Sequence, residues 1–138
     1  MRRPINFQAM GIGSCINIGG TFFCAFLINN AAIHYLVSRG VPLSELGNAL
    51  GASTPLVVTL FGVAVLFAIL GGYAAARIAG RDFLMYSFGS GLPVLLINIV
   101  GLFSPVPSYQ PLWYYGLSLL LCIPLALFGA YLAKRKAT

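Results

Sequence analysis

Residues Leu56 to Arg81 read LVVTLFGVAVLFAILGGYAAARIAGR, and this stretch decides the fold of the chain. Its first two thirds are almost purely apolar, as is typical of a helix that faces lipid. In its last turns, small residues recur at every fourth position, a spacing that lets a neighbouring helix approach closely within a membrane. The two rows of small residues are Gly71, Ala75 and Ala79, and Gly72, Ala76 and Gly80. Arg77 and Arg81 end the segment at the expected water boundary.

The composition of the chain favours a membrane environment. Its 138 residues are 59% hydrophobic and only 7% charged, with a mean hydropathy of +0.93. A water-soluble fold of this size could not bury so much apolar surface. The net charge of +6 comes from basic residues that flank apolar runs, without aromatic interleaving. We therefore expect the lipid bilayer as a partner, and no nucleic acid.

Four apolar segments are each long enough to cross a bilayer as a helix, which takes roughly 20 residues. We predict transmembrane helices over residues 10–37, 55–80, 83–103 and 112–133. The remaining segments are an outer loop with a short amphipathic helix (38–54), a proline-rich outer loop (104–111) and a basic tail (134–138). The expected fold is an all-α, four-transmembrane-helix bundle that forms a single membrane domain over residues 1–138.

Small and polar residues give the first and third spans a side that should face protein. On the first span, Asn17 shares a stripe with glycines, whereas Phe22, Phe23 and Phe26 cover much of the other side and should face lipid. We predict the helix-packing residues to be Gly13, Gly20, Gly71, Gly72, Ala75, Ala76, Gly80 and Gly91.

Basic residues predict the orientation of the chain in the membrane. Seven of the eight fall on the side that holds the two termini and the link between the second and third spans, and Arg39 alone falls opposite. Because basic residues resist translocation, both termini are predicted to be cytoplasmic. The expected interface anchors are Trp113, Tyr114 and Tyr115 in an aromatic belt, and Arg77, Arg81, Lys134 and Arg135 at the basic ends.

The ends of the second and fourth spans match each other. Gly71–Arg77 reads GGYAAAR and Gly129–Arg135 reads GAYLAKR, so small, aromatic and basic positions agree. One interpretation is a weak internal repeat of two helical hairpins, related by an axis along the membrane normal. The other is that any helix leaving the membrane tends to end in small, Tyr and Arg residues.

The same endings resemble those of a broad group of small four-span bacterial inner-membrane proteins. That group shares a G-G-Y/F-x-A-A-R-x-A ending on the second helix, and a P-x-W opening and a P-x-A-x-x-G-x-x-x-A-basic ending on the fourth. Here these motifs are Gly71–Ala79, Pro111–Trp113 and Pro124–Arg135. The resemblance implies a location in the bacterial inner membrane and brings no activity with it.

Few side chains could carry catalysis or hold a metal. Glu45 and Asp82 are the only acidic residues and lie at predicted membrane edges, so the chain lacks the carboxylate at depth that proton-coupled transporters use. The cysteines lack the paired spacing of disulfides or metal sites; they are Cys15, Cys24 and Cys122. We predict no catalytic residue, metal site or cofactor, although a haem site that uses one histidine stays open at His34.

The candidate polar cluster consists of Asn29, Asn30, His34 and Asn98. The expected topology puts Asn98, on the third span, at a depth similar to the end of the first. Amides in hydrocarbon need partners, because an unmade hydrogen bond there costs several kcal/mol. The cluster either joins the first and third helices or lines an outward-facing pocket for a small polar solute or a quinone headgroup.

Three functions are compatible with the sequence. The preferred one is a non-catalytic membrane subunit or accessory protein, which assembles as a homo-oligomer or within a larger complex through its small-residue helix faces. The alternative is a small transporter, channel or lipid-handling protein that acts as a homo-oligomer. The third is a redox or enzyme subunit with a cofactor near His34.

Overall fold

The computed structural model describes residues 6–80, 82–104 and 110–135, and every element in these ranges is helical. The long helices are α1 (Phe7–Ser38), α3 (Thr54–Ala79), α4 (Phe83–Phe103) and α5 (Leu112–Arg135). All four are long and apolar enough to cross a membrane. They confirm the predicted all-α four-helix bundle, and the protein is a multi-pass membrane protein.

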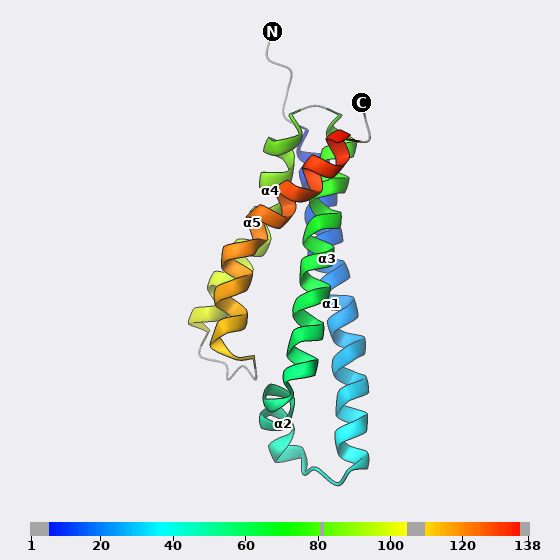
Figure 1. Ribbon diagram of the computed structural model, residues 1–138, viewed down its shortest axis with the longest axis vertical. Helices are drawn as coiled ribbons and strands as arrows, with labels where there is room; N and C mark the ends of the chain where they lie inside the picture. The colour runs from blue at the N-terminus through cyan, green and yellow to red at the C-terminus, as the bar shows by residue number, and fades with distance from the viewer. Residues whose placement is uncertain (1–5, 81, 105–109, 136–138) are drawn as a thin grey trace.

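The four long helices alternate in direction. Figure 1 shows that α1 and α4 begin, and α3 and α5 end, at the same end of the bundle. We call this the proximal end and the opposite one the distal end. Arg39 caps the distal end of α1, whereas Arg77 and Arg135 lie in the last turns of α3 and α5 at the proximal end. Arg81 lies outside the described residues.

Two short elements connect α1 to α3 at the distal end: the 3-10 turn η1 (Leu43–Glu45) and α2 (Leu46–Ala52) (Figure 1). Leu50 is 5% exposed, whereas Leu43 is 80% exposed. The connection therefore holds a short helix within the outer loop predicted over residues 38–54. Most of the second predicted loop, over residues 104–111, lies outside the described residues.

Local chemistry sets where α1 begins and where α3 ends. The side-chain Oδ1 of Asn6 accepts a hydrogen bond from the Ala9 N–H at 3.2 Å, so α1 begins at Phe7, three residues before the predicted start. Gly80 ends α3 in the left-handed conformation, with φ at +65°. A Cβ at Gly80 would meet nothing within 4 Å. Gly80 is therefore a helix cap, not the packing residue that its spacing predicted.

Small residues bring the helices into close contact at the proximal end. A Cβ added to Gly13 of α1 would lie 2.7 Å from the Gly71 carbonyl oxygen of α3, and one added to Gly71 would lie 2.6 Å from the Gly13 carbonyl oxygen. Ala75 and Ala76 are both 0% exposed, and Gly91 packs against Ile123 of α5. Such close backbone approach is how membrane helices gain van der Waals packing.

The crossing of α3 and α5 is reciprocal. A Cβ on Gly72 would overlap the Ala126 backbone, and one on Gly129 would overlap the Ile69 carbonyl. Gly72 thus meets Ala126, and Gly129 meets Ile69 and Tyr73. The sequence match instead aligns Gly71, the neighbour of Gly72, with Gly129. In addition, α3 packs against α4, whereas α1 and α5 hardly touch. These contacts are not those of two hairpins related by a two-fold axis.

Burial is concentrated in the proximal half of the bundle. The buried residues of α1 are Ala9, Gly13 and Asn17, and those of α4 are Tyr86, Ser87, Gly89, Ser90 and Gly91. All of them precede the middle of their helices. The bundle is consequently tight where small residues meet and looser in the distal half, where α1 and α4 carry bulkier side chains.

Candidate functional site

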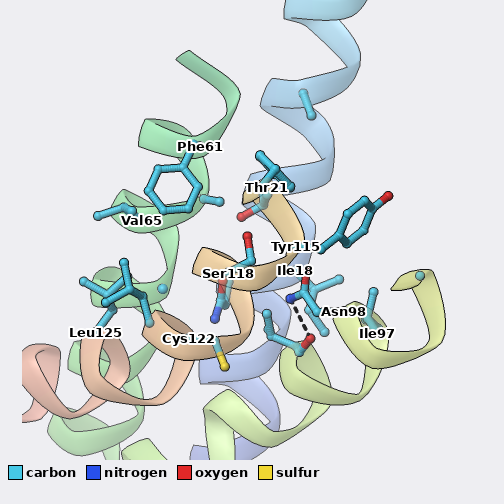
Figure 2. A pocket seen from close by; sticks show the side chains of 18 of the residues that line it. Ile18, Thr21, Phe61, Val65, Ile97, Asn98, Tyr115, Ser118, Cys122 and Leu125 are labelled. Carbon is cyan, nitrogen blue, oxygen red and sulfur yellow. Dashed lines mark hydrogen bonds between the residues drawn. The ribbon is translucent and has the colours of Figure 1, made fainter. Parts of the chain in front are cut away.

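A cavity of about 280 Å³ lies between the four long helices (Figure 2). It is just distal to the proximal region in which the small residues pack closely. Its walls are formed by some of the side chains within residues 17–25 of α1, 61–68 of α3, 94–101 of α4 and 114–125 of α5, together with Gln110. Most of these side chains are apolar, such as Ile18, Val65 and Leu125. A cavity with such walls suits a molecule that is mainly hydrocarbon.

The cavity exists because α3 and α5 contact each other at both ends. At the proximal end they meet through Gly72 and Gly129, and Figure 1 shows α5 running obliquely across α3 there. At the distal end the Tyr114 side chain, 9% exposed, packs with Val57 and Leu60 of α3. Pro93 lies inside α4 and Pro124 inside α5, and a proline inside a helix allows it to bend.

An aromatic cluster of Phe61, Trp113 and Tyr114 closes the distal side of the cavity. The Phe61 ring meets the Tyr114 ring edge-on at 5.8 Å between centroids, and the Trp113 ring at 6.3 Å. Of the three aromatic residues expected as interface anchors, Trp113 is exposed and fits that role. Tyr114 is instead buried against α3, and Tyr115 lies beside Gly101 and lines the cavity.

Two polar atoms of α1 stand out at the cavity wall. Asn17 is only 3% exposed, yet its Nδ2 has no hydrogen-bond partner in the described part of the chain. One turn later, the buried Oγ1 of Thr21 also lacks one there. Both residues line the cavity, and Figure 2 shows Thr21 of α1 pointing toward Ser118 of α5. Buried donors without partners are rare in proteins, so these two indicate a missing polar partner.

Asn98 lines the same cavity, but the other members of the expected polar cluster do not. The Asn98 Nδ2 donates to the Val94 carbonyl of its own helix at 2.9 Å (Figure 2). The Asn30 Nδ2 likewise donates to its own helix, and His34 is exposed. Asn29 is half-buried, with its Oδ1 unpaired in the described ranges. The cluster expected from the sequence is therefore divided.

Helix register explains this division. Helices α1 and α4 both start at the proximal end, and Asn98 lies fifteen residues after Phe83, as Phe22 lies fifteen residues after Phe7. Asn98 is therefore level with Thr21 and Phe22, about two turns short of Asn29. From the sequence, Asn17 was expected on a packing stripe, and Thr21 and Ser118 were not predicted to contribute to a site. The signal that could have found the site is the one-turn spacing of Asn17 and Thr21 within an apolar helix.

The described residues hold no group of three His, Cys, Asp or Glu side chains that could bind a metal ion. The cysteines are all free: Cys15 is exposed, Cys24 half-buried, and Cys122 buried at the cavity wall. No protein-family model, curated protein or solved structure matches the chain.

Proposed function

We propose that the protein binds a small, mainly apolar molecule with a hydrogen-bond acceptor in the cavity, as a transporter or lipid-handling protein does. The observation that carries this proposal is the unpaired Nδ2 of Asn17, a donor that is 97% buried beside a cavity. An amide nitrogen only donates, so its partner must be an acceptor such as a carbonyl, quinone or ether oxygen. The volume of about 280 Å³ suits a ring or a short headgroup.

The packing of the small-residue faces supports this function over assembly with a partner. Gly71 and Gly72 are buried, and Ala75 and Ala76 are 0% exposed, all within one copy of the chain. These faces were the feature that favoured an accessory subunit. Because the bundle itself covers them, they are not free to bind another protein.

We also propose a location in the bacterial inner membrane, with the proximal end in the cytoplasm. Arg77, Lys134 and Arg135 lie in the last helical turns at the proximal end, and Arg39 lies at the distal end. Basic residues gather on the cytoplasmic side of a membrane protein. The motif resemblance of Gly71–Ala79 supports the same location.

Binding of two matched probes tests the ligand class. Tetramethylbenzoquinone offers two acceptor oxygens, and tetramethylbenzene has the same methylated ring without them. Quenching of the single tryptophan, Trp113, by the quinone reports binding, because Trp113 packs on Phe61 at the cavity wall. The protein in lipid nanodiscs should bind the quinone, and tetramethylbenzene should compete weakly.

Asn17→Leu separates a ligand donor from a residue that only joins helices. Loss of one hydrogen bond, worth about 1 kcal/mol, should weaken quinone binding by roughly fivefold to tenfold. Stability should stay equal or rise, because leucine removes a buried donor that has no partner. Asn30→Leu is the control: it makes the same change on the same helix at an exposed position outside the cavity.

Two results would contradict the proposal. If Asn17→Leu destabilises the protein and leaves binding intact, Asn17 serves to join helices. If neither probe binds, the proposed function is wrong.

A further inference from the structure

We infer that the cavity opens sideways to the bilayer, between the distal halves of α1 and α4, and that its ligand is a membrane-dissolved amphiphile. This inference rests on the proposed function and adds the source of the ligand. The polar head of the amphiphile would lie inside, at Asn17 and Thr21, and its hydrocarbon chain would pass out between the two helices into lipid.

Side-chain and backbone contacts cross three of the seams around the cavity. Between α1 and α3, Gly20 packs on the Phe67 ring, and farther out Ala25 and Ile28 pack on the cluster of Val57, Leu60 and Tyr114. Between α3 and α5, the Gly72 crossing and the aromatic cluster close both ends. Between α4 and α5, Gly91 meets Ile123, and the Gly101 backbone meets the Tyr115 ring.

The seam between α1 and α4 differs, because its hydrogen bonds and glycine contacts are proximal. The Asn6 N–H donates to the Tyr86 hydroxyl at 3.0 Å, and the Ser14 hydroxyl donates to the Ser90 carbonyl at 3.1 Å. Met10 lies over Gly89 between them. Within the described residues, the hydrogen bonds and glycine contacts between α1 and α4 stop at Ser14 and Ser90. Beyond that level, α1 packs only slightly against α5, and the Tyr115 ring of α5 lies beside Gly101 of α4.

Two side chains line the cavity and also face the outside at this seam. Phe22 of α1 is 62% exposed, and Ile97 of α4 is 44% exposed, yet both belong to the cavity wall. Asn98, which follows Ile97, lines the cavity as well (Figure 2). We call Phe22 and Ile97 the rim. A rim of hydrocarbon at membrane depth admits an apolar chain from lipid and discourages water.

Among the described residues, aromatic rings lie at the distal side of the cavity. There the edge-on contact of Phe61 with Tyr114 lies across the end of the cavity, and Trp113 packs behind it. A solute from water would have to separate these rings, whereas an amphiphile in the bilayer already lies beside the rim. The lateral route therefore determines the ligand class: an amphiphile with one small polar head and a chain.

Exchange kinetics of a benzoquinone that carries a decyl chain test this route. The wild-type protein and its variants are placed in nanodiscs, and quenching of Trp113 is followed by stopped flow. Phe22→Ala and Ile97→Ala remove bulk from the rim, so each should raise both the association and the dissociation rate by at least roughly threefold. A benzoquinone sulfonate, which its charge keeps in water, should not bind.

Matched controls lie next to the rim in sequence. Phe23 is 64% exposed and Leu96 is 60% exposed, and neither lines the cavity. Phe23→Ala and Leu96→Ala should therefore leave both rates unchanged.

The outcomes separate this inference from the proposed function. If the decyl quinone binds but the rim variants exchange it at the wild-type rate, or if the sulfonate binds as fast, the ligand comes from water and the lateral route is wrong. The cavity would then remain a binding site. If neither the decyl quinone nor tetramethylbenzoquinone binds, both proposals fail together.

Discussion

Gly71→Ala tests whether the proximal contact between α1 and α3 tolerates a single methyl group. The new Cβ would lie 2.6 Å from the Gly13 carbonyl oxygen, whereas ordinary van der Waals contact begins at 3.4 Å. The difference, 3.4 − 2.6 = 0.8 Å, must come from separation of the two helices, because the opposing atom is backbone and cannot rotate away. Overpacking of this kind destabilises proteins by about 1–3 kcal/mol.

Gly62→Ala is the matched control on the same helix. A Cβ at Gly62 would meet nothing within 4 Å. The gain in helix propensity from glycine to alanine is common to both variants, so it cancels in their comparison. We expect Gly71→Ala to be less stable than Gly62→Ala by about 1–3 kcal/mol. The assay is reversible unfolding in mixed micelles with increasing SDS, followed by the loss of helical circular dichroism.

The reciprocal variant sharpens the test. Gly13→Ala would put its Cβ 2.7 Å from the Gly71 carbonyl oxygen, so it needs nearly the same separation of α1 and α3. Once one methyl group has separated the helices, the second requires little more. The double variant should therefore lose less stability than the sum of the single losses. The reasoning is refuted if Gly71→Ala is as stable as Gly62→Ala.

Three further outcomes are expected. Ser87→Ala should lower the free energy of unfolding by about 0.6 to 2 kcal/mol, because it removes a buried 2.7 Å hydrogen bond to the Gly72 carbonyl; unchanged unfolding in SDS would show that the bond is not stabilising. Tyr86→Phe removes the hydroxyl that accepts from the Asn6 N–H, so amide exchange in the first turn of α1 should speed up by roughly threefold to tenfold; equal exchange would contradict it. In a cysteine-free background, an impermeable maleimide should label Ser44→Cys in intact cells and label Lys134→Cys only after permeabilisation, and the reverse pattern would overturn the proposed orientation.

Helix composition and length, which are local properties, were predictable from the sequence. Hydropathy alone identified four spans, because a chain in hydrocarbon satisfies its backbone groups within each helix. The lipid-facing side of α1 was predictable for the same reason. Phe22, Phe23 and Phe26 were expected to face lipid and are 62–64% exposed. The spacing of small residues also predicted which helix faces would pack closely. Gly80 is an exception: it is a helix cap, because it stands one residue beyond the end of α3.

The tertiary structure decided how deep each polar side chain lies in the bundle and which residues it contacts. Asn98 was expected near Asn29 and Asn30, but it lines the cavity at the level of Thr21. The register of the helices relative to one another depends on where each helix starts and on how α5 crosses α3 at Gly72. Many contacts together set both. A cavity is likewise a property of four helices together. The sequence by itself determined that the helices lie in a membrane, and only their packing left the Asn17 donor unpaired beside a space that a ligand could fill.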